Sequence, residues 1–219
     1  NVSDDLVVVA GDNLLSFDLG EFVDFFESRG TPCLAAYDVG SKDRASSYGL
    51  VQLDDDRVID FQEKPDNPQS TLVSIACYAF PAETLPDFET YLADGNNPDE
   101  PGWLMQWLQD RGSVHAFTFD GAWFDIGTPE SYLDAVSWYL DGETFVDETA
   151  TVEDSTLGSN VHLMSGASVV DSELERTVVF ENTEINTATI SDSVIDEESS
   201  IEAVDLTETL VGSYSQIRH

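Results

Sequence analysis

Lys64 is one of only two lysines in a chain of 219 residues that carries 44 acidic and 8 basic side chains. It lies in the run Phe61-Gln62-Glu63-Lys64-Pro65, directly after a stretch of alternating residues that is typical of a strand. Because Pro65 ends the strand, Glu63 and Lys64 are expected to present a carboxylate and an ammonium at its end. Sheets of α/β proteins contact their ligands at strand ends. The run therefore indicates a polar ligand-binding site, with a solvated charge pair before a turn as the alternative.

The charge balance limits the partners that this chain can bind. Its formal net charge is −36, whereas binding to nucleic acid or to an anionic membrane depends on Lys and Arg. We therefore expect no nucleic-acid and no membrane partner. The acids are spread between apolar residues along the whole chain, and a hydrophobic content of 41% is enough for a core. This composition indicates a halophile with a salt-rich cytoplasm, because in molar salt the Debye length is only about 3 Å and self-repulsion is screened.

The first part of the chain alternates between strand and helix patterns. Strands are expected at 6–10, 33–37, 49–53, 58–63, 72–80 and 114–119, and helices at 19–28, 82–93, 103–111 and 129–140. The last helix has Thr128 as its cap and Pro129 at its first position. This alternation predicts the α/β class. Cys33 and Cys77 lie in apolar strand segments and are expected to be buried and unpaired.

The second part of the chain is a repeat with a step of 16 residues. Aliphatic residues hold this step at three positions of the repeat, in the series 169, 185, 201 and 217, the series 174, 190 and 206, and the series 163, 179, 195 and 211. One inward aliphatic side chain every five or six residues, three in each repeat, is typical of a three-sided parallel β-helix. The sequence therefore predicts two domains, one at 1–142 and a β-helix at 143–219.

Four short motifs occur in an order that resembles a known family. They are Gly11-Asp12-Asn13, Tyr48-Gly49-Leu50, the Phe61–Pro65 run and the stretch WFDIGTPESY at 123–132. Together they resemble the second half of the sugar-1-phosphate nucleotidylyltransferases, the NDP-sugar pyrophosphorylases. The stretch NPDEPGW at 97–103 resembles the archaeal glucose-1-phosphate thymidylyl- or uridylyltransferase branch. This resemblance implies the C-terminal part of a Rossmann-like nucleotidyltransferase domain, followed by a left-handed parallel β-helix of short hexapeptide-like repeats.

The resemblance also implies a reaction. The phosphate of a sugar 1-phosphate, with glucose 1-phosphate as the expected sugar, attacks the α-phosphorus of dTTP or UTP and expels pyrophosphate. Charge builds up on several phosphate oxygens, so that cations and positioning matter more than a covalent nucleophile. The implied partners are therefore a nucleoside triphosphate and a sugar 1-phosphate, and the implied cofactor is Mg²⁺.

Five residues of the motifs take roles by this resemblance. Asp12 and Asp125 would hold the Mg²⁺, and the alternative for each is an acid in a turn or at a cap. Lys64 would place a point charge on the sugar phosphate. Glu63 would accept hydrogen bonds from sugar hydroxyl groups, and Gly49 would let the backbone approach the sugar closely.

One part of the family pattern has no counterpart in these residues. The family opens with a Gly-rich loop of the form GxGTRL and a basic segment, which cradle the triphosphate with backbone N–H groups. The residues that precede Asp12 do not contain that loop. We therefore expect that the chain starts within a domain and that these 219 residues are inactive alone.

Two other functions remain open from the sequence. The β-helix could be an acetyl-CoA-dependent acetyltransferase that uses His162 as its general base, although few basic residues are at hand to hold the phosphates of CoA. Alternatively, it could be a non-catalytic scaffold that assembles a homo-oligomer. The sequence contains no apolar run long enough to span a membrane, and no signal peptide, so that a cytoplasmic location is expected.

Overall fold

The computed structural model describes residues 3–219, which form two compact units. One unit ends at Trp123, and the other runs from Phe124 to His219. The domain boundary expected from the sequence, at 142/143, lies after the helix α5 (Pro129–Leu140) and stays a prediction. The compact units divide before this helix because it packs on strands of the repeat region.

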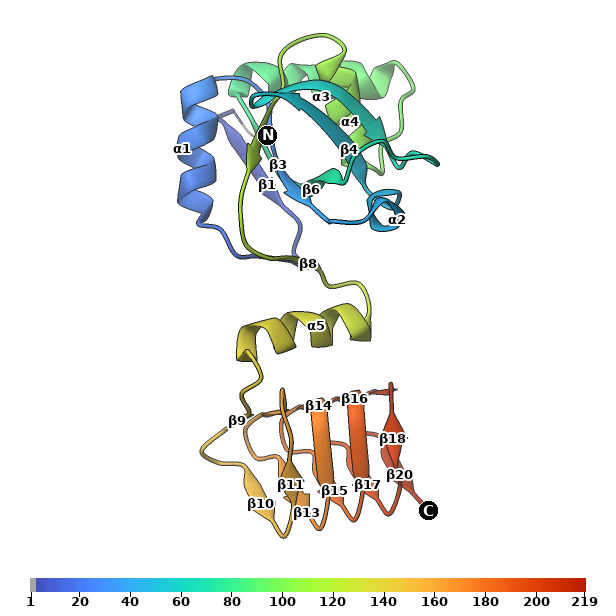
Figure 1. Cartoon of the computed structure of the whole chain (residues 1–219). Coiled ribbons are helices and arrows are strands. Elements are labelled where there is room, and N and C mark those ends of the chain that lie inside the picture. Colours follow the sequence, from blue (N-terminus) through green and yellow to red (C-terminus); the bar gives the residue numbers. More distant parts are fainter. Residues whose placement is uncertain (1–2) are drawn as a thin grey trace. The chain divides into compact units, whose positions relative to one another are not determined.

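A curved six-stranded sheet forms the centre of the first unit (Figure 1). Its strands are β1 (Leu6–Val9), β3 (Cys33–Asp38), β4 (Gly49–Asp54), β5 (Arg57–Glu63), β6 (Leu72–Phe80) and β7 (His115–Thr118). They are ordered β1-β6-β3-β7-β5-β4, and β4 also pairs with β6, so that five of the strands close a ring. Among the described residues, parallel pairing in this sheet is confined to β3 and β7. The unit therefore has the mixed α/β content that was predicted, with a sheet that is mostly antiparallel.

Short helices and one further strand pair complete the first unit. They are α1 (Leu19–Arg29), α2 (Lys42–Ala45), the 3₁₀ helix η1 (Ala82–Thr84), α3 (Leu85–Ala93), α4 (Pro101–Gln109), β2 (Asn13–Leu15) and the start of β8 (Trp123–Asp125). Asp18 caps α1 by accepting a hydrogen bond from the backbone N–H of Gly20, and Gly30 ends it in the left-handed conformation that glycine favours. Within residues 3–219, no helix combines the length and the apolar character needed to cross a membrane.

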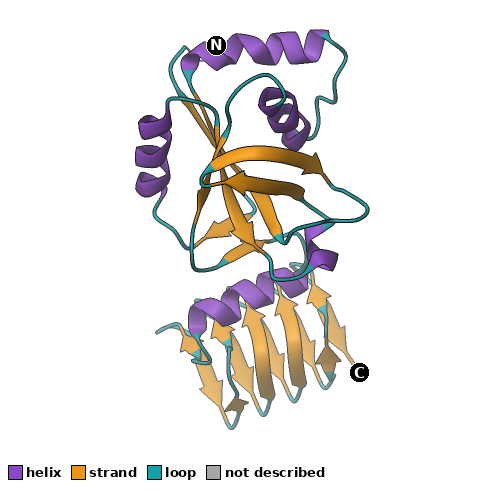
Figure 2. Ribbon diagram, turned by 45° about the horizontal axis from the view of Figure 1, so that its top comes forward, coloured by secondary structure: helices purple, strands orange, loops and turns teal. Residues whose placement is uncertain are grey.

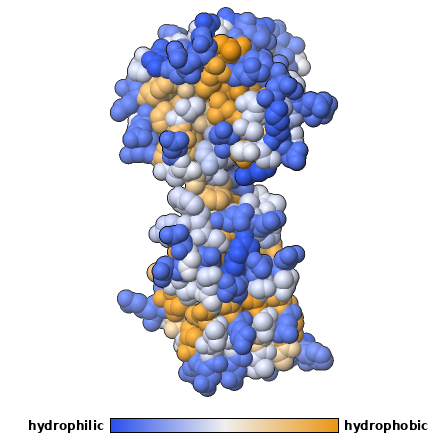
Figure 3. All heavy atoms as spheres, viewed as in Figure 1, coloured by the Kyte–Doolittle hydropathy of each residue, from blue (hydrophilic) through white to orange (hydrophobic). Residues whose placement is uncertain are grey.

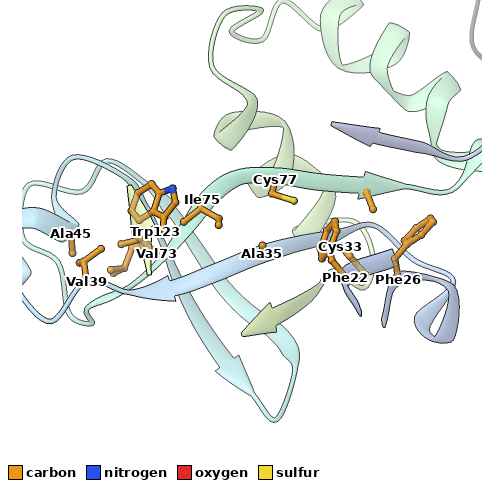
Figure 4. Packing of buried hydrophobic residues seen from close by; sticks show 12 residues of the cluster. Phe22, Phe26, Cys33, Ala35, Val39, Ala45, Val73, Ile75, Cys77 and Trp123 are labelled. Atoms are coloured by element: carbon orange, nitrogen blue, oxygen red, sulfur yellow. The ribbon is translucent and has the colours of Figure 1, made fainter. Parts of the chain in front are cut away.

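The core beneath α1 is built from aromatic and small apolar side chains (Figure 4). Phe22 and Phe26 of α1 share one buried cluster with Cys33 of β3 and Cys77 of β6. Both cysteines are buried and unpaired, as predicted. Burial raises the pKa of both thiols to about 12, so that neither is a reactive thiolate at neutral pH.

The second unit is a parallel β-solenoid with α5 lying along it (Figure 2). Its strands are β9 (Phe145–Val146), β10 (Thr151–Glu153), β11 (Thr156–Leu157), β12 (His162–Leu163), β13 (Ser168–Val170), β14 (Glu173–Val179), β15 (Glu184–Asn186), β16 (Thr189–Ile195), β17 (Ser200–Glu202), β18 (Leu206–Thr207), β19 (Leu210–Val211) and β20 (Gln216–Arg218). One sheet is ordered β10-β13-β15-β17-β20, and the other is ordered β18-β16-β14-β12-β9.

The 16-residue step of the sequence is the register of this solenoid. Val169 lies beside Ile185, and Ile185 lies beside Ile201, each 16 residues further along the chain. All eleven aliphatic residues of the three predicted series belong to the solenoid core. Residues with left-handed backbone recur at the same step, and the series Asn160, Arg176, Asp192 and Glu208 is one such column. These positions let the chain turn sharply between successive sides of each coil. The predicted 16-residue repeat is therefore confirmed as the step of a parallel solenoid, which is consistent with a β-helix.

Helix α5 is tied to the solenoid by apolar and charged contacts. Leu133 of the helix packs against Val178 and Val194 of the solenoid strands. Arg176 donates hydrogen bonds to Asp134 of the helix, at 2.6 Å, and to Asp192, at 2.9 Å. At its start the helix is closed by a capping box between Thr128 and Ser131.

The chain carries 44 acidic residues, and hydrophilic residues lie beside apolar ones on the visible face of each unit (Figure 3). In the second unit, a cavity of about 420 Å³ is lined by Glu130, Asp192 and Glu208 together with Arg176. Three carboxylates thus share a space with one guanidinium. Repulsion of this kind is weakened by salt, because mobile cations screen it at distances beyond a few ångströms.

We therefore expect the melting temperature to rise steeply between about 0.1 M and about 2 M KCl. The measurement is thermal unfolding of the chain followed by circular dichroism in a series of KCl concentrations. Sucrose at matched water activity serves as the control, since it favours the compact state without screening charge. A melting temperature that stays flat or falls with KCl would refute the adaptation to molar salt that the composition indicates.

Candidate functional site

The hairpin of β4 and β5 brings three of the predicted site residues together. Gly49 opens β4 and lies directly opposite Glu63, the last residue of β5. Lys64 follows at once, in the left-handed conformation with φ of 44°, and its backbone N–H donates to the carbonyl of Tyr48 at 3.2 Å. The carboxylate and the ammonium therefore stand at a strand end, as the sequence predicted.

Two glycines make room for the carboxylate of Glu63. A Cβ atom at Gly102 would lie 1.7 Å from Glu63 Oε2, and one at Gly49 would lie 2.9 Å from the same oxygen. Gly49 is also closed in by the ring of Phe61, whose Cζ would be 2.6 Å from that Cβ. The partly buried position raises the pKa of Glu63, and the nearby Lys64 offsets part of this effect. At both positions a larger residue would collide with the side chain of Glu63, which explains why glycine stands there. The contact of Gly49 with a sugar stays a prediction.

The ammonium of Lys64 has a partner that the sequence analysis did not single out. It donates a hydrogen bond to Oε1 of Glu100, the residue that precedes α4. The other oxygen of Glu100 accepts from Nε1 of Trp103, at 3.0 Å, and from Nδ2 of Asn97, at 3.1 Å. The hydrogen bond to Glu100 raises the pKa of Lys64, and the same bond lowers the pKa of Glu100. In the sequence, only the family resemblance of residues 97–103 pointed to this segment, and it assigned no role to Glu100.

Asp12 lies in the exposed turn between β1 and β2. Its Oδ1 accepts a hydrogen bond from Nδ2 of Asn13 at 2.8 Å. Oδ1 of Asn13 in turn accepts from the buried indole of Trp123 at 2.6 Å, and Trp123 packs edge-on against Tyr48. Three of the four motifs therefore meet around Trp123. The sequence alone did not show that this residue links them.

Asp125 is partly buried at the end of β8 and belongs to the second unit, whereas Asp12 belongs to the first. That the two carboxylates share one ion therefore stays a prediction. Within residues 3–219, no three His, Cys, Asp or Glu side chains are grouped closely enough to hold a metal ion by themselves. A two-carboxylate site that is completed by phosphate oxygens and water is the kind that Mg²⁺ uses, so that these residues suit the ion.

His162 would be the general base if the solenoid were an acetyltransferase, and it lies in β12. Its ring packs edge-on against Phe145 of the preceding coil, at 5.1 Å between centroids, and β12 pairs with β9 and β14. Burial lowers the pKa of His162. The side chain therefore contributes to packing between coils.

The contact between Gly102 and Glu63 makes a prediction that separates binding from stability. If Glu63 accepts hydrogen bonds from sugar hydroxyl groups, as the resemblance implies, Gly102→Ala should weaken binding of a sugar 1-phosphate by about ten-fold or more, because the new methyl group must displace the carboxylate of Glu63. The melting temperature should change little, since the displaced atoms are the far end of a flexible side chain. Calorimetric titration and thermal unfolding would measure the two effects.

Gly112→Ala is the matched control, because a Cβ atom there would meet only the carbonyl of Leu108, at 3.9 Å. It should leave binding unchanged. Equal binding by the Gly102 and Gly112 variants would mean that Glu63 does not contact the ligand.

Comparison with known proteins links the sequence to a family. The sequence profile of the family described as nucleotidyl transferase matches residues 1–142. The chain is 32% identical over 130 residues to a glucose-1-phosphate adenylyltransferase of Fervidobacterium nodosum, covering 58% of this chain and 31% of that protein. It is 32% identical over 133 residues to a putative mannose-1-phosphate guanyltransferase of Sulfolobus acidocaldarius, covering 61% of this chain and 35% of that protein.

A third similarity extends into the solenoid. A glucose-1-phosphate adenylyltransferase of Mycoplasma mobile is 26% identical over 202 residues, which is 84% of this chain and 53% of that protein. The chain spans about a third of the length of the first relatives that it matches, at 31% and 32%. Since the family profile covers more than half of the chain, the chain belongs to the nucleotidyl transferase family.

Proposed function

We propose that this chain forms the sugar-phosphate side of an enzyme that transfers a nucleotidyl group to a sugar 1-phosphate. The observation that carries the proposal is the pair Glu63 and Lys64 at the end of β5, next to the glycine Gly49 and inside a domain of this family. A carboxylate for hydroxyl groups beside an ammonium for a phosphate matches the two chemical ends of such a substrate.

The sugar and the nucleobase are proposed from different sources. Glucose 1-phosphate is the proposed sugar, and the names of two relatives support it. The thymidylyl or uridylyl choice rests on the archaeal resemblance of residues 97–103, whereas the relatives are named for adenylyl and guanylyl transfer. We propose in addition that the solenoid is a left-handed β-helix and that it assembles a homo-oligomer.

Mg²⁺ is the proposed cofactor. Asp12 and Asp125 would hold it, and the bound ion would neutralise charge on the phosphate oxygens during transfer. Asp12 suits this role because it is exposed and is oriented by Asn13, which the indole of Trp123 fixes in turn. The residues of this chain would thereby hold and orient the sugar phosphate near the ion.

Replacing Lys64 with Ala tests the function at its central residue. In the full-length gene product, Lys64→Ala should weaken binding of glucose 1-phosphate by roughly 10- to 100-fold, the range for loss of a hydrogen bond from a charged group. The KM for this substrate should rise much more than kcat falls, because the charge binds the phosphate before and during transfer. Calorimetric titration and steady-state kinetics would measure the two effects.

Lys42→Ala is the matched control, since Lys42 is the only other lysine and lies exposed in α2. It should leave both quantities unchanged. If the Lys64 and Lys42 variants behave alike, Lys64 does not bind the phosphate and the proposed site is wrong.

A further inference from the structure

Glu100 is held in place by its own segment of the chain. Its Oε2 accepts hydrogen bonds from Asn97, three residues before it, and from Trp103, three residues after it. Trp103 belongs to the first turn of α4, so that the carboxylate is anchored to the start of that helix. Only Oε1 faces Lys64. Glu100 therefore keeps two hydrogen bonds when Lys64 moves away.

Lys64 is the more exposed member of this pair. Its side chain is 49% exposed, and its backbone is fixed at the end of β5 while four methylene groups carry the charge. The carboxylates of Glu63 and Glu100 both act on its ammonium, so that its charge is already compensated. When a phosphate approaches Lys64, the ammonium is therefore already hydrogen-bonded to a carboxylate of the protein.

We propose that Glu100 is the resident counter-ion of Lys64, and that a sugar 1-phosphate binds by displacing this carboxylate from the ammonium. The inference rests on the proposed function, because it takes Lys64 as the residue that receives the phosphate. Glu100 acts here through Lys64 and lowers the affinity for every phosphate ligand. A ligand that also contacts Glu63 through its hydroxyl groups is then retained better than phosphate alone.

A titration with charge-neutral variants tests the competition. Glu100→Gln keeps the length of the side chain and an oxygen for Trp103, but removes the charge that pairs with Lys64. In the full-length gene product in 2 M KCl, where longer-range repulsion is screened within about 2 Å, it should tighten binding of glucose 1-phosphate about two- to five-fold, as expected for loss of a partly exposed ion pair. Inorganic phosphate should bind more tightly by a similar factor, and glucose should not.

Two further variants separate competition from simple repulsion. Glu100→Gln made in the Lys64→Ala background should have little effect, because no ammonium is left to be released. Asp99→Asn removes the charge one residue away and should also have little effect. An equal gain in both backgrounds, or an equal gain from Asp99→Asn, would show that the carboxylate acts through space and would overturn the proposal.

The remaining outcomes are equally decisive. Weaker binding by the Glu100→Gln protein would show that Glu100 positions Lys64 for the ligand, and unchanged binding would show that it does not compete; either result overturns the proposal. If Lys64→Ala binds glucose 1-phosphate as the natural protein does, or if no protein of the series binds it, then the proposed function fails and the counter-ion role fails with it.

Discussion

Replacing Ile190 with Asp is expected to unfold the solenoid while the first unit stays folded. Ile190 is fully buried, and in the parallel register it lies between Leu174 of one coil and Leu206 of the next. A carboxylate at this position would find no hydrogen-bonding partner in an aliphatic stack. An uncompensated buried charge costs about 3–5 kcal/mol, which is a large part of the stability of a typical domain.

Thr189→Asp is the comparison, since it adds the same charge one residue away on the exposed side of β16. The backbone N–H of Thr189 donates to Asp205, so that an added carboxylate lies near another acid. Both variants are therefore measured in 2 M KCl, where that repulsion is screened. Ile190→Val serves as a second control, because losing one methylene group typically costs only about 0.5–1.5 kcal/mol.

Hydrogen exchange read by mass spectrometry would locate the effect. Amides between Phe145 and Arg218 should lose protection in Ile190→Asp and keep it in both controls, and those of β3 and β6 should stay protected in all three. Similar losses in the Ile190 and Thr189 variants would mean that the register of the coils is wrong.

The solenoid was predictable because its aliphatic residues are spaced in the sequence by the same step as the register of its strands. Each coil must place one side chain inward on each of three sides, and the coils stack in parallel, so that a step of 16 residues in the sequence becomes a contact in space. The elements of the first unit were predictable for a similar reason. The hairpin of β4 and β5, the long strand β6 and the capped helix α5 all follow local patterns and turn residues.

The sheet pairing and the division between the units were not predictable in this way. Alternating strands and helices suggest parallel neighbours, but β6 is long enough to pair with β1, β3 and β4 in antiparallel fashion. Nothing in the local sequence of α5 shows that Leu133 packs on the solenoid. Such choices depend on which apolar faces meet, and residues far apart in the sequence decide them.

At the candidate site, the motifs indicated candidate residues but not the residues that contact them in the folded chain. Gly49, Glu63 and Lys64 meet as expected because they are joined by one hairpin. Glu100 and Gly102 lie at a helix start 36 or more residues further along the chain. Nothing in the sequence indicated that they contact Lys64 and Glu63. In a chain with 44 acids, one carboxylate has no mark that sets it apart before its contacts are known.

Asp12→Asn and Asp125→Asn are each expected to lower the turnover of the full-length gene product by about two orders of magnitude or more, the scale for losing a group that stabilises charge in the transition state. Asn has the same shape as Asp, so that the change removes charge without removing volume. Melting temperatures should therefore be unchanged within a few degrees. Asp24→Asn, on the exposed side of α1, is the matched control and should leave turnover intact.

The double variant tests whether the two carboxylates act on one Mg²⁺. Groups that act as a unit are not additive, so that the double variant should lose little more activity than the worse single variant. If the two residues act at independent sites, their losses of turnover should multiply. Two losses of about two orders of magnitude each would then combine to about four. Calorimetric titration with Mg²⁺ in the presence of glucose 1-phosphate supplies a readout apart from activity. Each single variant should weaken ion binding, and undiminished binding in either one would remove that residue from the proposed metal site.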